Sequence, residues 1–209
     1  MRKPNYIYLL ITLFFLFTNC KNASAQNGEW VKGHYYTWSG ERVEGFLKHR
    51  FQAQFGSGPD NSLRFMVDRD AKRITLTTKD VKSFVLQIER GKVDSFIVIK
   101  NFTINVFATY REDFVKVVAT GPLNLYMHYS TVSTGSKYGV TTSPVSNWLV
   151  QKGESLTLIK NQSNFKEVMP QLVSDDTELV EKITNKEFKY RDIEEVIRLY
   201  NQKHLTSLN

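Results

Sequence analysis

The amino-acid sequence predicts a mainly β protein, α+β overall, in which an antiparallel sandwich, roll or partial barrel is followed by three short C-terminal helices. Two observations lead to this prediction. Before about residue 160, apolar residues alternate with polar ones or form short runs rich in β-branched residues, as strands do. After that point, apolar residues recur at the spacing of amphipathic helices.

The predicted strands begin with a hairpin, because residues 30–38 and 42–51 flank Ser39-Gly40 and glycine tolerates the positive φ of a tight turn. The other strands predicted from alternation or β-branched runs include 74–77, 96–99, 102–108, 114–119 and 123–130. The turns predicted between strands are Arg69-Asp70, Arg90-Gly91 and Gly121-Pro122. The spacing indicates about eight to ten strands, which favours an antiparallel arrangement.

Two segments interrupt this pattern. Residues 52–61 contain two glycines and a proline, and we expect a loop there. Residues 131–146 are dominated by Ser, Thr and Gly, with Tyr138 and Val140 as their apolar anchors. We expect a mobile surface loop, and the alternative, a loop that folds over a pocket, stays open.

The helical tail is predicted from three repeats of one signature, a capping residue followed by an acid and an apolar stripe. The predicted cap and acid pairs are Asn164 with Glu167, Asp175 with Glu178, and Asp192 with Glu195. The first stripe consists of Phe165, Val168, Met169, Leu172 and Val173. Such short helices need a partner surface, so we expect the segment 161–209 to dock on the β-rich domain 26–160.

Residues 1–25 have the three parts of a cleavable signal peptide. Arg2 and Lys3 form a basic start, residues 7–17 form an apolar run too short to span a bilayer, and Ala23 and Ala25 provide small residues for signal peptidase. We expect cleavage after Ala25, export to the periplasm or cell surface, and no transmembrane segment in the mature chain.

Two other interpretations of the leader stay open: it could remain as an anchor, or Cys20 could be a lipid-attachment site. Cleavage would remove Cys20, the chain's one cysteine, and a thiol-free exported chain of this size indicates a bacterial envelope. Removal of Arg2, Lys3 and Lys21 lowers the formal net charge from +7 to +4. This modest excess forms no basic cluster along the sequence, and export argues against nucleic acid as a partner.

The mature chain has four histidines, but no two lie four residues apart on a predicted helix and no zinc motif is present. His34 and His49 could face each other across the first hairpin, where a partly exposed polar pair is the commoner arrangement and a metal site the rarer one. His128 falls on the polar face of its predicted strand, where exposure explains it. We predict no metal, cofactor or catalytic residue.

The carboxylate pairs also have structural explanations. Asp68/Asp70 and Glu112/Asp113 fall at predicted turns, and Asp175/Asp176 and Glu194/Glu195 at helix starts. The sequence has neither a Gly-x-Ser-x-Gly elbow nor a phosphate-binding loop. In the first hairpin, Trp30, Tyr36 and Trp38 share one face, and we favour core packing over a ligand platform.

Three stretches carry a resemblance: residues 31–47, with a Ser-Gly turn followed by Val-Glu-Gly-Phe-Leu; Gly121-Pro-Leu-Asn-Leu-Tyr; and residues 165–201, which end in Tyr-Asn. They resemble uncharacterised exported envelope proteins of Bacteroidetes. The resemblance implies a Gram-negative envelope setting and transfers no catalytic or binding residue.

Two functions remain to be distinguished. The first is a non-enzymatic β-rich binding or interaction module whose partner is an envelope protein, glycan or lipid. The second is an envelope hydrolase acting on glycan, lipid or peptide, with a site under residues 131–146. A concave pocket that holds a histidine or carboxylates in a perturbed environment would favour the second.

Overall fold

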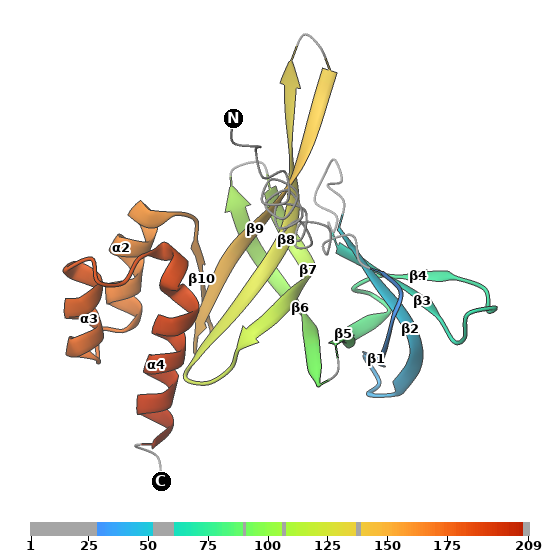
Figure 1. Cartoon of the computed structure of the whole chain (residues 1–209), viewed down its shortest axis with the longest axis horizontal. Coiled ribbons are helices and arrows are strands. Elements are labelled where there is room, and N and C mark those ends of the chain that lie inside the picture. Colours follow the sequence, from blue (N-terminus) through green and yellow to red (C-terminus); the bar gives the residue numbers. More distant parts are fainter. Residues whose placement is uncertain (1–28, 52–60, 90, 106–107, 137–138, 207–209) are drawn as a thin grey trace, which may run out of the picture.

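The computed structural model describes residues 29–51, 61–89, 91–105, 108–136 and 139–206. Within these ranges, ten strands form one antiparallel sheet in the order β10-β9-β8-β7-β6-β5-β1-β2-β3-β4 (Figure 1). The strands are β1 Val31–Thr37, β2 Arg42–Phe51, β3 Asn61–Met66, β4 Ile74–Leu76, β5 Val81–Glu89, β6 Lys92–Asn105, β7 Ala108–Ala119, β8 Leu123–Ser136, β9 Gly139–Lys152 and β10 Ser155–Ile159. The sheet is not closed, and the predicted antiparallel, mainly β class is confirmed.

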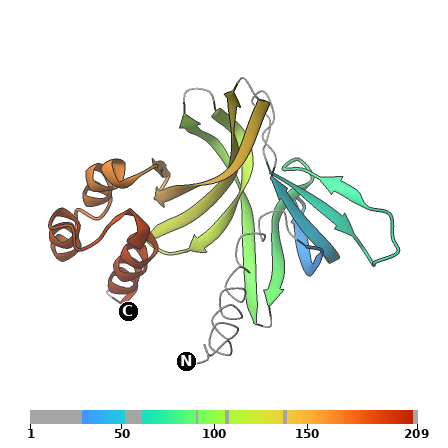
Figure 2. The same ribbon diagram turned by 45° about the horizontal axis from the view of Figure 1, so that its top comes forward.

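The sheet is strongly bent, with β6–β10 curving on one side and β1–β4 diverging on the other (Figure 2). The bend brings the start of β3 against β7 and β8, which are distant from it in the sheet order. One cluster of buried apolar side chains joins β1–β3 to β5–β7 and includes Leu47, Leu63, Phe84, Phe96 and Phe114. A second cluster lies on β6–β9 and contains Phe102, Ile104, Tyr110, Val115, Tyr126 and Leu149.

The first hairpin has a close backbone approach at two paired glycines. Gly33 lies opposite Gly45 in the register of β1 and β2. A Cβ on Gly33 would collide with the carbonyl oxygen of Val85, and one on Gly45 would collide with that of Met66. Glycine is therefore required at both positions, since any side chain would push the neighbouring strand away.

The prediction of a loop over residues 131–146 is wrong. Strands β8 and β9 pair without interruption from Leu123 opposite Lys152 to Ser136 opposite Gly139. In Figure 1 this hairpin extends beyond the rest of the sheet. The hydrogen bonds between two strands join backbone groups and do not require apolar side chains. Thr and Val also favour extended backbone, so a polar composition did not exclude strands here. The loop predicted at 52–61 lies outside the described residues except for Asn61, which begins β3.

Strand β8 also departs from the predicted pattern of one buried and one wet face. Leu123 and Leu125 are buried under the helical tail, while Tyr126, His128 and Ser130 are buried on the other face. Both faces of β8 are covered because helices pack on one side and the bent sheet folds over the other. Alternation along this strand therefore separates two buried environments.

The three predicted helices are confirmed as α2 Gln162–Leu172, α3 Thr177–Thr184 and α4 Ile193–Thr206, and the 3₁₀ turn η1 Tyr190–Asp192 precedes α4. The first cap lies earlier than predicted: Asn161 accepts the Asn164 N–H at 3.0 Å, and the Asn164 side chain reaches back to the Lys160 N–H at 3.0 Å. The second cap is Asp176, which accepts from Leu179 N, rather than Asp175. At the third start the cap position is Lys189 rather than Asp192, and Asp192 is the acid three residues later that accepts the Lys189 N–H at 2.8 Å.

The helices pack on the face of β8–β10 that lies away from β1–β4 (Figure 1). Their buried residues join Leu123, Leu125, Val150 and Ile159 of the strands in a third apolar cluster. The helical members are Phe165, Met169, Val173, Leu179, Ile183, Ile193, Val196, Ile197 and Tyr200. Among the described helices, none is both long and apolar enough to cross a membrane.

Candidate functional site

A polar cluster is buried where the bent sheet meets itself. It consists of His49 on β2, Asn61 at the start of β3, Asp113 on β7 and His128 on β8, all less than a tenth exposed. Asp113 accepts the Asn61 backbone N–H at 3.1 Å, the Asn61 Nδ2 at 2.9 Å and the Phe114 N–H at 2.8 Å. His128 Nε2 lies 2.8 Å from the second carboxylate oxygen of Asp113.

Asn61 connects the members of this cluster. Its Nδ2 also donates to the Tyr129 carbonyl at 2.9 Å, so its Oδ1 is the acceptor that faces His49 Nε2 at 2.8 Å. His49 must therefore carry a proton on Nε2. Four side chains from four strands are thus joined through one amide.

The two histidines have different surroundings. His49 lies among the rings of Phe51, Phe84, Phe96 and Tyr129. Burial lowers the pKa of His49 to about 4, although the hydrogen bond that His49 donates to Asn61 and the charge of Asp113 act in the opposite direction. His49 is consequently neutral at neutral pH.

His128 packs edge-on against Phe102 and Tyr110, with ring centroids 5.1 and 4.7 Å away. Its Nδ1 is buried and has no hydrogen-bond partner, whereas its Nε2 faces Asp113. A histidine oriented by a carboxylate can serve as a base. In the described part of the chain, however, no serine, threonine or cysteine side chain is hydrogen-bonded to either nitrogen of this ring, and His128 is fully buried. The geometry fits a clamp that holds β3 against β7 and β8.

A second feature is an open groove on the opposite face of the β6-β5-β1-β2 region, with a volume of about 430 Å³. Leu47, His49 and Phe51 point into the protein, so Glu44 and Phe46 at alternate positions of β2 face outward. The groove is lined by Lys32, Gly33, His34, Arg42, Glu44, Gly45, Phe46, Val67, Val85, Gln87 and Val93. Its walls thus come from β1, β2, β5 and β6 and from Val67, which follows β3.

The polar part of the groove is a row of three side chains. His34 lies opposite Glu44 in the strand register, and the Arg42 Nη2 lies 3.3 Å from His34 Nδ1 while its Nη1 contacts Glu44 at 2.9 Å. Desolvation and the charge of Arg42 lower the pKa of His34, against the opposing charge of Glu44. Since Arg42 can only donate, His34 Nδ1 accepts and its Nε2 carries the proton.

The apolar part of the groove is unusually open. Val67 is 64% exposed and Val93 is 56% exposed, although both are aliphatic residues that line its walls. Phe46 also lines the groove, two residues after Glu44 on β2, with the Arg69 guanidinium 5.4 Å from its ring centroid. The groove therefore presents apolar surface next to a proton donor and mixed charges.

The aromatic residues of the first hairpin do not pack as predicted. Tyr35 is buried, whereas Trp30 and Tyr36 are only partly buried and Trp38 is 46% exposed. The prediction that Trp30, Tyr36 and Trp38 form core is wrong, because Trp30 and Tyr36 lie on the outer side of the first hairpin and Trp38 lies in the turn that follows β1. The indole N–H of Trp38 donates a 2.9 Å hydrogen bond to the Thr78 carbonyl, which holds the side chain at this turn.

A third set of polar residues lies in the helical tail. Tyr200 Oη donates to the Asp175 carboxylate at 2.8 Å, Lys152 Nζ contacts the same carboxylate at 3.2 Å, and the His204 ring stacks on Tyr200 at 4.0 Å. Burial acts to raise the pKa of Asp175, but the hydrogen bonds from Tyr200 and Lys152 outweigh it and lower the pKa. This set fixes α4 to the segment between α2 and α3.

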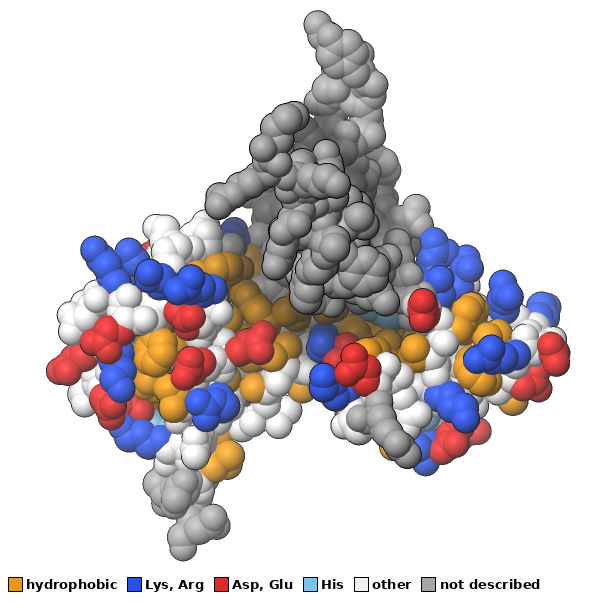
Figure 3. Space-filling view, in the orientation of Figure 1, with side chains coloured by type: hydrophobic (Ala, Val, Ile, Leu, Met, Phe, Trp, Pro, Cys, Tyr) orange, Lys and Arg blue, Asp and Glu red, His pale blue; other side chains and the backbone are white. Residues whose placement is uncertain are grey.

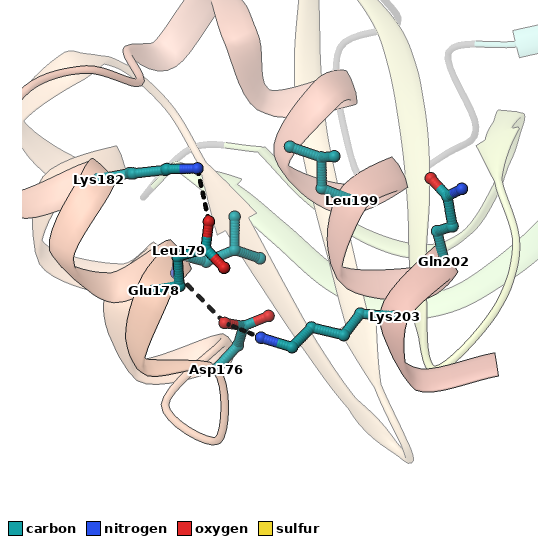
Figure 4. A pocket seen from close by; sticks show the side chains of 7 residues that line it. All are labelled: Asp176, Glu178, Leu179, Lys182, Leu199, Gln202 and Lys203. Atoms are coloured by element: carbon teal, nitrogen blue, oxygen red, sulfur yellow. Dashed lines mark hydrogen bonds and ion pairs between the residues drawn. The ribbon is translucent and has the colours of Figure 1, made fainter. Parts of the chain in front are cut away.

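Figure 4 shows a shallow depression between α3 and α4, with a volume of about 280 Å³. Lys203 Nζ contacts Asp176 at 2.8 Å and Lys182 Nζ contacts Glu178 at 2.7 Å. Asp176 also caps α3, so its carboxylate holds α3 and α4 together through the cap and the contact with Lys203. We assign this depression a structural role.

The histidine predictions have mixed outcomes. His34 and His49 do not face each other, because the register pairs His34 with Glu44 and His49 with Leu63. His128 is not exposed, because the start of β3 folds over it. Within the described ranges, no three His, Cys, Asp or Glu side chains converge as a metal site.

The carboxylate predictions also have mixed outcomes: some pairs lie where they were predicted and one does not. Asp68 and Asp70 lie in a turn, where Asp68 accepts the Asp70 N–H, and Glu194 and Glu195 lie in the first turn of α4, both as predicted. Glu112 and Asp113 are in the interior of β7 rather than at a turn. Asn61 was missed altogether, because a single asparagine after a Gly/Pro-rich stretch carries no signal of a buried amide.

Comparisons with known proteins add no relative: no family model, curated protein or solved structure matches this chain. The candidate sites therefore rest on the geometry above.

Proposed function

We propose that this chain is an exported, non-enzymatic envelope protein, a β-rich binding module of the periplasm or cell surface. The basic, apolar and small-residue parts of residues 1–25 support export with cleavage after Ala25, and those residues lie outside the described ranges. The resemblance of three stretches to exported Bacteroidetes proteins agrees with this setting.

The observation that carries the proposal is the outer groove. Isolated apolar residues on a surface are ordinary, but exposed valines that line one concavity beside a histidine, an arginine and a glutamate form a pattern typical of ligand sites. Apolar walls next to polar groups suit an amphiphilic envelope component.

A retention experiment tests this proposal. The processed protein is immobilised, exposed to detergent-solubilised envelope extract and washed, and the retained components are identified by mass spectrometry. We expect a component that is retained by the wild type and lost in the Val67→Gln/Val93→Gln variant. Because both valines are mostly exposed, this variant should fold normally.

The matched control is Leu205→Gln, which alters an aliphatic side chain of similar exposure, 50%, at the end of α4. The control should retain the component as the wild type does. The proposal fails if the wild type retains nothing above an empty matrix, or if retention is unchanged in the groove variant.

The export part of the proposal has its own test, intact-mass measurement of protein recovered from the cell envelope. We expect a chain that begins at Gln26. A mass that includes residues 1–25, or recovery of the protein from the cytosol, would contradict it, and a mass that includes a lipid on Cys20 would favour the lipoprotein interpretation.

The hydrolase remains a second candidate because of one observation, the 2.8 Å contact between His128 and Asp113 on the strand that leads into residues 131–146. A screen of p-nitrophenyl esters and glycosides tests it. Hydrolysis by the wild type that disappears in a folded His128→Gln variant would support the enzyme and contradict the non-enzymatic proposal. Absence of turnover, or turnover unaffected by the substitution, would remove the candidate.

A further inference from the structure

The pairing of β2 with β3 creates a basic cluster that the sequence does not show. Lys48 lies directly opposite Arg64, and Arg50 lies two residues further along β2, opposite Ser62. The neighbours of Lys48 and Arg50 on β2, and of Arg64 on β3, are buried, since Leu47, His49, Phe51, Leu63 and Phe65 all point into the protein. The three basic side chains therefore share the outer face of the sheet, which also carries the groove.

The cluster is compact. Directly opposite residues of antiparallel strands have Cα atoms about 5 Å apart, and residues two apart on one strand lie roughly 7 Å apart. Lys48, Arg50 and Arg64 thus form a triangle rather than a line. Figure 3 shows several basic side chains, with acidic ones among them, on the part of the molecule formed by β1–β4.

Among the residues that the structure describes, no ion pair joins an acidic side chain to Lys48, Arg50 or Arg64. The row that contains Lys48 and Arg64 continues to Thr75 on β4, and the row of Arg50 ends at Ser62. The nearest acid on the same face of β2 is Glu44, which lies beyond Phe46 and already contacts Arg42. Like charges directly opposite each other destabilise a sheet, so this arrangement disfavours folding unless an anion offsets it.

The chemistry of the triangle matches a phosphate group. Two guanidinium groups can each bind phosphate oxygens through paired N–H donors, and an ammonium group adds a point charge. The apolar groove lies on the same face, because Phe46, two residues before Lys48 on β2, lines it. A phosphate site beside exposed valines fits a ligand that is charged at one end and apolar at the other.

We infer that the outer face of β2 and β3 binds the phosphate headgroups of anionic phospholipids at a bilayer surface, through Lys48, Arg50 and Arg64. This inference rests on the proposed function and names the chemical class of the partner. Trp30 supports a membrane partner. The register of β1 and β2, extended by one residue, places Trp30 opposite Lys48, and the Arg73 guanidinium lies 5.7 Å from its ring centroid. Tryptophan beside basic residues is typical of headgroup contacts.

Vesicle co-sedimentation tests the inference with the processed protein. The probes are vesicles of phosphatidylcholine alone and vesicles that also contain phosphatidylglycerol. We expect binding to the anionic vesicles only, weakened by added salt. The Lys48→Gln/Arg50→Gln/Arg64→Gln variant should bind at least about tenfold more weakly, because each basic residue near an anionic surface contributes on the order of a factor of five.

The matched control removes three basic residues from the helical tail, Lys166→Gln/Lys186→Gln/Arg198→Gln, with the same change in net charge. It should bind almost as well as the wild type. Thermal unfolding checks that the triangle variant is folded, and we expect its stability to equal or exceed that of the wild type because a like-charge pair has been removed.

Three results would overturn the inference: equal binding to both kinds of vesicle, equal loss in the two charge variants, or release by inorganic phosphate at constant ionic strength. The last result would assign the triangle to free phosphate rather than to a bilayer. Retention of another envelope component by the groove is measured separately with Val67→Gln/Val93→Gln, so the inference can fail while the proposed function stands.

Discussion

Asn201 holds the helical tail to the sheet by pairing its side-chain amide with the peptide groups of Leu123. Its Oδ1 accepts the Leu123 N–H at 2.8 Å and its Nδ2 donates to the Leu123 carbonyl at 2.7 Å. The amide thus replaces a strand partner at the start of β8, and Asn201 is 5% exposed. The Tyr-Asn and Gly-Pro stretches singled out in the sequence are in contact here.

Replacement of Asn201 by alanine should loosen this junction. Both backbone groups of Leu123 would stay buried without these partners, which costs about 1–3 kcal/mol for each unsatisfied group. We expect the free energy of unfolding in urea to fall by about 2–4 kcal/mol in total. The neighbouring exposed substitution Gln202→Ala should change it by less than about 0.5 kcal/mol, and similar values for the two variants would show that the junction does not stabilise the fold.

Gly121 faces the same asparagine and should not tolerate a side chain. Its φ is +155°, and a Cβ there would lie 2.6 Å from the Asn201 side chain. We expect Gly121→Ala to destabilise the protein by about 2–3 kcal/mol, since the clash adds to the backbone strain.

Gly91→Ala is the control for backbone strain alone. The φ of Gly91 is +82°, and a Cβ added there would have no other atom within 4 Å. Its cost should stay near 1 kcal/mol. In the double variant Gly121→Ala/Asn201→Ala the two costs should not add, since the clash disappears with the amide. Full additivity would contradict the contact.

The burial of His49 predicts a loss of stability in mild acid. The pKa of His49 is about 4 in the folded protein and its ordinary value is 6.5, so the unfolded state binds more protons between these values. The contribution of His49 to the free energy of unfolding is fully present above pH 6.5 and is lost as the pH falls toward 4. Near pH 5 the loss should amount to about 2 kcal/mol.

Urea unfolding near pH 7 and near pH 5 measures this loss. His49→Gln keeps an N–H donor for Asn61 but cannot titrate, so its stability should depend less on pH than that of the wild type. His34→Gln, at a partly buried position of the outer groove, should retain most of the wild-type dependence. If His49→Gln and the wild type lose equal stability on acidification, another group is responsible.

Asp113 should be among the most sensitive positions in the β domain. Its carboxylate accepts hydrogen bonds from Asn61 and Phe114 and contacts His128, all in buried surroundings. We expect Asp113→Ala to destabilise the protein by about 3–5 kcal/mol, as removal of one member of a buried polar pair does.

Glu154→Ala, in the exposed turn between β9 and β10, is the control and should be nearly neutral. A double-mutant cycle between Asn61→Ala and Asp113→Ala should show a coupling above about 0.5 kcal/mol, because the two side chains are in direct contact. Independent effects would mean that the cluster does not act as a unit.

The sequence predicted those parts of the fold that local periodicity determines. The first hairpin, the turn at Asp68 and Asp70 and the three helices are where the pattern places them. The first two helix caps shifted because two Asn or two Asp residues precede each of those stripes, and the pattern alone does not choose between them; the third shifted because the chain enters α4 through a 3₁₀ turn. The loop at 131–146 was wrong because the backbone pairing of β8 with β9 outweighs a polar composition.

The candidate sites depend on long-range register, which local patterns do not contain. His49, Asn61, Asp113 and His128 lie on four strands that meet only because the sheet bends. Lys48 and Arg64 look unremarkable along the chain and become a like-charge pair when β3 aligns with β2. The groove likewise needs β5 beside β1, a pairing between strands separated by three others in the sequence.

The position of bound ligand on the protein tests the central claim most directly. Backbone amide shifts of isotope-labelled, processed protein would be followed by NMR during addition of the envelope component recovered in the retention experiment. The outer-face model predicts that the largest shifts cluster at His34, Glu44, Phe46 and Val85. Shifts that cluster instead around His128 and along the β8–β9 hairpin would contradict it and would favour a site under residues 131–146.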